Sequence, residues 1–141
     1  MNNFIFENAT KAVFGQGCVK EYLSCMVSHY GPNVLLAYGG GSIKRNGIYD
    51  EVCGILQSTD KNIVEFSGIM PNPTYAKVQE GAKLVRGNHI DLILAVGGGS
   101  VMDCCKAVSM AARYDGDLWA DYWARPGVVD FEPVPLGMIV T

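Results

Sequence analysis

The chain has 141 residues, enough for one domain with a buried core. Its net charge of −3 and its lack of a basic block argue against nucleic acid as a partner. Hydrophobic residues make up 49% of the chain, yet no apolar run approaches the length of a membrane span. The N-terminus also lacks the basic start and long apolar stretch of a signal peptide. We therefore expect a cytoplasmic protein without a membrane partner.

The five cysteines are odd in number and have no zinc-type spacing. We expect reduced, mostly packed thiols, as is usual in the cytoplasm. Cys104 and Cys105 fall in the first turns of a predicted helix, where a helix N-terminus lowers a thiol pKa. A reactive thiol and a packed small side chain are both compatible with that position, and packing is the more common role.

Four short apolar runs, about 30 residues apart, predict buried strands at 34–38, 62–66, 92–96 and 136–140. The segments between them have helical periodicity. Alternation of apolar strands and helices predicts an α/β fold, a Rossmann-like parallel sheet with helices on both faces. Before the first strand, residues 3–14 are expected to be extended, as a hairpin or an edge pairing.

The helix predicted after the second strand shows the periodicity well. We expect one face to be apolar and the opposite face to be charged. The apolar set is Tyr75, Val78, Ala82 and Val85, and the charged set is Lys77, Glu80, Lys83 and Arg86. An earlier helix has a similar apolar stripe, formed by Ile48, Val52, Ile55 and Leu56.

Two of the predicted strands end in three glycines and a serine, at 39–42 and 97–100. Glycine lets backbone N–H groups approach an anion closely, and a helix N-terminus adds roughly half a positive charge. Ligands of parallel α/β sheets bind at the carboxyl ends of the strands, where both loops lie. The two loops together predict a ligand that carries phosphate at more than one place.

The second loop continues into Ser100 and Asp103, a spacing typical of a helix capping box. A cap does not need three glycines, whereas close approach of a pyrophosphate does. Asp103 beside bound phosphate would have to face a neutral group, such as a ribose hydroxyl. The pattern therefore favours phosphate binding, with a plain cap as the alternative.

The first loop bears on the choice of cofactor. Sites that select NAD place a carboxylate on the adenosine ribose, but no acid follows Tyr38 until Asp50, and Lys44 and Arg45 come between. A carboxylate about 4 Å from a 2′-phosphate costs on the order of 4 kcal/mol per phosphate charge at an effective dielectric of ~20. An exposed lysine contributes only ~1 kcal/mol. The missing acid favours NADP, and a flexible turn with a solvated Lys-Arg pair is the alternative.

Other polar and aromatic residues are less informative. Asn72, within a rigid Pro-Asn-Pro turn, either bonds its own backbone or presents its amide to a ligand. His29 and His89 are expected at the surface near helix ends. Trp119 and Trp123 are expected to pack, or to face a neighbouring domain.

These motifs resemble the N-terminal domain of the iron-dependent (group III) alcohol dehydrogenases, in particular the NADPH-using butanol dehydrogenase and aldehyde reductase branch. The fold implied is the dehydroquinate synthase-like N-terminal domain. The resemblance spans the chain and rests on the start at 1–4, the turn at 14–17, the loop at 38–44, the Pro-Asn-Pro turn at 71–73 and the segment at 94–103.

The resemblance assigns cofactor-binding positions in both glycine loops and beyond them. Residues 98–100 would bind the pyrophosphate, Asp103 a ribose and Asn72 the adenosine side. Residue 39 stands where NAD-preferring relatives carry aspartate, so residues 40 and 42 would accommodate the 2′-phosphate, and Thr141 would touch the adenine half. The full set of expected positions is Gly39, Gly40, Gly41, Ser42, Lys44, Asn72, Gly97, Gly98, Gly99, Ser100, Asp103 and Thr141.

The family continues into a helical domain that binds a divalent metal, iron or zinc, through one aspartate and three histidines. That domain is absent from residues 1–141, so we expect no catalytic or metal-binding residue in this chain and no activity from it alone. The resemblance further implies a small alcohol or aldehyde as substrate and a homodimer at full length. Two alternatives stay open: a nucleotide-binding module without catalysis, and a dehydroquinate synthase-like lyase.

Overall fold

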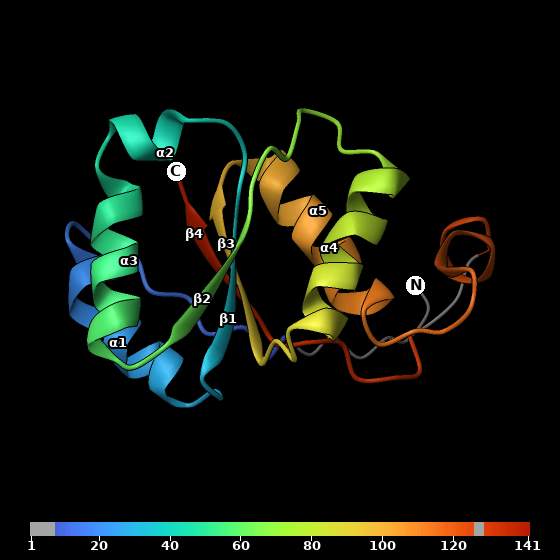
Figure 1. The fold of residues 1–141 in the computed structure, drawn as a ribbon, viewed down its shortest axis with the longest axis horizontal. Coiled ribbons are helices and arrows are strands. Elements are labelled where there is room, and N and C mark those ends of the chain that lie inside the picture. The colour runs from blue at the N-terminus through green and yellow to red at the C-terminus, as the bar shows by residue number, and fades with distance from the viewer. Residues whose placement is uncertain (1–7, 126–128) are drawn as a thin grey trace, which may run out of the picture.

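The computed structural model describes residues 8–125 and 129–141. In this part of the chain, four strands form a parallel sheet in the order β2-β1-β3-β4 (Figure 1). The strands are β1 (Asn33–Tyr38), β2 (Asn62–Phe66), β3 (Leu92–Gly97) and β4 (Leu136–Val140). Each predicted strand is confirmed to within one residue at either end.

Helices cover both faces of the sheet, which confirms the expected Rossmann-like α/β fold (Figure 1). On one face lie α1 (Cys18–Ser28) and α3 (Ile48–Ser58), and on the other α4 (Tyr75–Gly87) and α5 (Gly99–Ala111). The short α2 (Ser42–Arg45) follows β1, and a π-helical turn, η1 (Trp119–Trp123), follows α5.

The central strand β1 shows why its sequence is a continuous apolar run. Successive side chains point to opposite faces, and both faces are covered. Leu35 and Ala37 join the core under α4 and α5, whereas Val34, Leu36 and Tyr38 join the core under α1 and α3.

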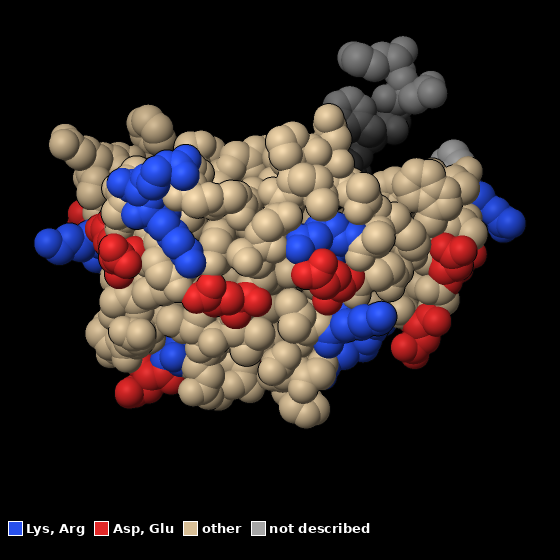
Figure 2. Space-filling model, turned by 45° about the horizontal axis from the view of Figure 1, so that its top comes forward, with Lys and Arg blue, Asp and Glu red and all other residues tan. Residues whose placement is uncertain are grey.

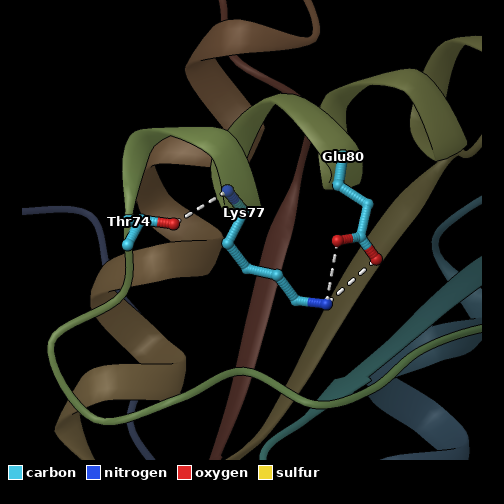
Figure 3. A network of polar contacts seen from close by, with 3 residues as sticks. All are labelled: Thr74, Lys77 and Glu80. Atoms are coloured by element: carbon cyan, nitrogen blue, oxygen red, sulfur yellow. Dashed lines mark hydrogen bonds and ion pairs between the residues drawn. The ribbon is translucent and has the colours of Figure 1, made fainter.

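The α4 helix differs from its predicted pattern at two positions. Tyr75 is 37% exposed instead of buried, and it packs near Trp119 with the ring centres 6.3 Å apart. Lys77 turns inward, and its ammonium lies 4.7 Å from the centre of the Phe66 ring. It also pairs with Glu80 at 2.9 Å (Figure 3). A lysine can bury its aliphatic stem and still keep its charged end beside a carboxylate, which the periodicity argument does not take into account.

Residues 8–14 contain no strand, so the predicted hairpin or edge pairing is wrong for this segment; residues 3–7 lie outside the described part. His29 and His89 are exposed at the ends of α1 and α4, as predicted. Across the described residues, the helices are all too short or too polar to cross a membrane.

Candidate nucleotide-binding site

The second glycine loop forms an open helix N-terminus at the carboxyl end of β3. Gly98 is the N-cap of α5, and no side chain caps the helix. The Gly98 carbonyl accepts hydrogen bonds from the N–H groups of Val101 at 3.1 Å and Met102 at 3.2 Å. The N–H groups of Gly99 and Ser100 precede these bonds, so they are donors that an anion can use.

The three glycines of this loop have different roles. A Cβ on Gly97 would lie 2.8 Å from Cγ2 of Val101, which is closer than packed atoms approach. A Cβ on Gly98 or Gly99 would meet no atom within 4 Å. Gly97 therefore allows the strand to pack against α5, whereas Gly98 and Gly99 leave open space in front of the free N–H groups.

The capping-box alternative is wrong for this helix. Ser100 is the second residue of α5, not its N-cap. The Asp103 side chain is 71% exposed and pairs with Lys106 at 3.2 Å, one turn further along α5. Its carboxylate does not reach back to the start of the helix.

Two backbone hydrogen bonds and one side-chain contact connect the segments at this edge of the sheet. The N–H of Gly68, in the β2–α4 loop, donates to the Gly39 carbonyl at 3.0 Å, and the Thr141 N–H donates to the Gly97 carbonyl at 3.1 Å. The Val101 side chain lies between the two glycine loops. Its Cγ2 is 3.6 Å from the Cβ position of Gly39 and 2.8 Å from that of Gly97. The structure thus brings Gly39, Gly97 and Thr141 to one edge of the sheet.

The first loop has a different construction. Gly41 is the N-cap of α2 and Ser42 its first residue, but α2 has only four residues and supplies a weak dipole. Gly40 has open space around its Cβ position. Arg45 lies against this loop, with Nη1 3.1 Å from the Cβ position of Gly41. Lys44 points to two aromatic rings beside the loop, those of Tyr38 and Tyr49.

Asn72 is exposed between its two prolines and adopts a left-handed conformation with φ 51°. Among the described residues, its side chain has no hydrogen-bond partner. The alternative in which Asn72 bonds its own backbone is therefore wrong, and its amide is open to solvent at the same edge as the glycine loops.

The buried cysteines of α5 are packed thiols. Burial raises the pKa of Cys104, and it raises the pKa of Cys105 to about 12. Both side chains lie in the core under α4 and α5. A thiol with a raised pKa is a poor nucleophile at neutral pH, so the packed alternative is confirmed over the reactive one.

Sequence reasoning missed Tyr49 and Glu65, whose side chains meet beside the first loop. The hydroxyls of Tyr38 and Tyr49 donate to the two oxygens of Glu65, and these bonds lower the pKa of the Glu65 carboxyl. Burial, followed by the bond to Glu65, raises the pKa of Tyr38. The available signal was an acid between the apolar residues Val64 and Phe66 of β2.

The described residues do not fit the metal site of the resembled family. Nowhere in 8–125 and 129–141 do three or more His, Cys, Asp or Glu side chains gather in a way that could hold a metal ion. No step of the chemistry is assigned to a metal bound by these residues.

A parallel sheet with glycine loops and an open helix N-terminus at its carboxyl edge defines a Rossmann-like domain, and this edge is where ligands of such sheets bind. The family model described as "Iron-containing alcohol dehydrogenase" matches residues 9–141, and the chain belongs to this family.

Curated and solved relatives agree with this assignment. The chain is 48% identical over 141 residues to a probable NADH-dependent butanol dehydrogenase 2 of Bacillus subtilis, covering all of this chain and 35% of the relative. It is 37% identical over 142 aligned residues to the NADPH-dependent aldehyde reductase YqhD of Escherichia coli, covering all of this chain and 36% of that protein.

A solved NADH-dependent butanol dehydrogenase A of Thermotoga maritima superposes with a TM-score of 0.88 at 38% identity, covering 100% of this chain and 35% of that one. The chain therefore spans about a third of the length of these relatives, which are themselves alcohol or aldehyde oxidoreductases by name.

Proposed function

We propose that this chain is the nucleotide-binding part of an NADPH-dependent, metal-dependent alcohol dehydrogenase or aldehyde reductase acting on primary alcohols and aldehydes such as butanol and butyraldehyde. The observation that carries the proposal is the uncapped start of α5. Its free N–H groups and open Gly98 and Gly99 positions face the edge where Gly39 and Thr141 also lie.

In this proposal each loop holds one part of the dinucleotide. The backbone at Gly98, Gly99 and Ser100 binds the pyrophosphate, and Asp103 exchanges Lys106 for a ribose hydroxyl. The adenosine side lies toward Asn72 and Thr141. Bound NADPH supplies the hydride that reduces a carbonyl carbon; the residues of this chain bind and orient it.

The first loop supports NADP(H) as the preferred cofactor. Gly39 offers no carboxylate, and its Cβ position lies 3.1 Å from the Ile69 carbonyl oxygen, so little room exists there for a larger residue. Gly40 leaves open space in the loop, and the charged side chains of α2, Lys44 and Arg45, are both basic. Relatives named for either NADH or NADPH share this domain, so the cofactor preference requires a direct measurement.

The substrate and the metal belong to a further domain in this proposal, and the 141-residue chain alone is inactive. The homodimer stays an expectation from the family resemblance, and the cytoplasmic location stays a prediction from composition. The mass of the polypeptide in its source cells, by immunoblot or intact mass spectrometry, tests whether a further domain is attached. Turnover of butyraldehyde by residues 1–141 alone would contradict this part of the proposal.

Substitution at Ser100 tests the pyrophosphate site. Ser100→Phe in the complete protein should weaken NADPH and NADH together, because both share the pyrophosphate. Ser100→Ala is the control: since Ser100 caps no helix end, stability should change by less than about 0.5 kcal/mol. Normal binding by Ser100→Phe, together with a stability loss of about 1 kcal/mol in Ser100→Ala, would favour a helix cap and argue against the site.

A further inference from the structure

Four side chains form a cluster beside the first glycine loop: Tyr38, Lys44, Tyr49 and Glu65. They come from β1, α2, α3 and β2, respectively. Tyr38 donates its hydroxyl to Oε2 of Glu65 at 2.5 Å, and Tyr49 donates to Oε1. The two rings meet edge to face, with centres 5.7 Å apart and planes at 70°.

Lys44 and Glu65 belong to the same cluster but do not pair. The Lys44 ammonium lies 4.4 Å from the centre of the Tyr49 ring and 5.2 Å from that of Tyr38. Within the described residues the ion pairs are Lys77–Glu80 and Lys106–Asp103, and Lys44 forms none. Each Glu65 oxygen accepts a tyrosine hydroxyl, which fixes the position of the carboxylate, and the Lys44 ammonium lies over ring faces instead of in an ion pair.

The cluster adjoins the loop that the proposed function gives to the adenosine ribose. Tyr38 directly precedes Gly39, and Arg45 lies against Gly41. No acidic residue occurs from position 39 to position 49. Figure 2, which brings this edge of the molecule forward, shows basic side chains gathered at the upper left, over α2.

We propose that the hydroxyls of Tyr49 and Tyr38 hold the Glu65 carboxylate out of a direct ion pair with Lys44, and so keep the Lys44 ammonium available to bind a phosphate monoester on the ribose held by the first loop. Lys44 is then a specificity-determining residue, and Tyr49 is a positioning residue that acts through Glu65. The inference rests on the proposed function and adds residues outside the glycine loops to it.

The alternative is a structural role, in which Lys44 only packs on the two rings. Removal of the Tyr49 hydroxyl separates the two roles. In Tyr49→Phe the ring under Lys44 remains, but one Glu65 oxygen loses its donor and becomes free to pair with Lys44. That pairing competes with a bound phosphate. Adding Glu65→Gln removes the competing charge, so the double variant should recover the phosphate affinity.

The experiment measures the dissociation constants of NADP⁺ and NAD⁺ by fluorescence or calorimetry on the complete protein and its variants. Lys44→Met should weaken NADP⁺ about 10-fold and change NAD⁺ less than about 2-fold, as expected for a lost charge-assisted hydrogen bond. Lys44→Arg keeps the charge and should keep the preference. Lys83→Met, which removes an exposed lysine of α4, is the matched control and should change neither constant.

Tyr49→Phe should weaken NADP⁺ about 3-fold, and Tyr49→Phe/Glu65→Gln should return it to near the parent value. The inference is overturned if Lys44→Met weakens both nucleotides equally or neither, or if the double variant binds NADP⁺ no better than Tyr49→Phe. Failure of the parent protein to bind either nucleotide would instead overturn the proposed function. If the parent protein binds both nucleotides and Lys44→Met changes neither dissociation constant, the inference is overturned and the proposed function stands.

Discussion

The backbone N–H of Gly68 donates to the carbonyl oxygen of Gly39 at 3.0 Å, which ties the β2–α4 loop to the end of β1. This bond holds the neighbouring Ile69 carbonyl 3.1 Å from the Cβ position of Gly39. Gly39 is therefore enclosed on one side by backbone, which cannot move aside as a flexible side chain can. A residue introduced here changes both the space and the charge at the first glycine loop.

Gly39→Asp should shift the cofactor preference from NADPH toward NADH by at least about 10-fold. A carboxylate near a 2′-phosphate costs on the order of 4 kcal/mol per phosphate charge at about 4 Å, whereas the NADH ribose hydroxyl can donate to it. The measurement is kcat/KM with each cofactor in the complete protein.

The control for this change is Gly39→Asn, which has the same size without the charge. It meets the same Ile69 carbonyl and should weaken both cofactors to a similar degree. An unchanged cofactor ratio in Gly39→Asp would remove the argument for NADPH preference, as would an equal shift of the ratio in both variants.

Two glycines of the second loop should respond to alanine in opposite ways. Gly97→Ala places a Cβ 2.8 Å from Val101 Cγ2 in a closely packed region, so it should lower the free energy of unfolding by about 1–3 kcal/mol. Gly98→Ala meets no atom within 4 Å, so the fold should be retained. Its methyl group instead occupies the open space in front of the α5 N-terminus and should weaken nucleotide binding.

Urea unfolding and nucleotide titration of the same two variants test this division. Each variant serves as the control of the other, because the change from hydrogen to methyl is identical. If Gly98→Ala bound NADPH as tightly as the parent, the space in front of α5 would not be a phosphate site. If Gly97→Ala were fully stable, the close packing against Val101 would not require glycine.

The sequence alone predicted the strands well, because each is buried on both faces and appears as a continuous apolar run. It also indicated the edge of the site, since glycine triplets at strand ends have few other uses. It did not predict the contact of Glu65 with Tyr49. That contact depends on the register of β1 against β2, which pairs Leu36 with Glu65 and brings the acid under α3.

The inward position of Lys77 was also missed, for a related reason. Periodicity assigns a lysine to the solvent by its charge, although its four-carbon stem can cover an aromatic ring such as Phe66. Side chains that are long, charged and partly apolar are therefore the ones that a pattern of polar and apolar letters places least well.

The Glu65 cluster should make stability depend on pH at the acid end. Hydrogen bonds from Tyr38 and Tyr49 lower the folded-state pKa of Glu65 below its ordinary value of 4.5. The ionised Glu65 therefore adds to the free energy of unfolding above about pH 4.5, and this contribution is lost as the pH falls through the lowered pKa. Glu65→Gln should flatten the decline in the free energy of unfolding as the pH falls below about 4.5.

Urea denaturation across that range measures the effect, with Glu51→Gln as the control. Glu51 is an exposed acid of α3 without a tyrosine partner in the described residues, so its loss should leave the slope unchanged. At alkaline pH, the raised pKa of Tyr38 has a similar consequence. The protonated Tyr38 adds to the free energy of unfolding below pH 10.0, and this contribution is lost as the pH rises through the raised pKa. If the free energy of unfolding changed with acid pH equally in the parent protein and in Glu65→Gln, the hydrogen bonds from the tyrosines to Glu65 would not form in solution.

Cys105 should be inert to alkylation in the native protein although it lies near the start of a helix. Burial raises its pKa to about 12, so at about pH 8 only about one part in ten thousand is thiolate, and the side chain is fully enclosed. Cys25, exposed on α1, is the internal control and should react first. Timed iodoacetamide labelling, followed by peptide mass spectrometry, compares the two sites under native conditions and in denaturant. Equal native rates would contradict the packed environment of Cys105, whereas equal rates only after unfolding would support it.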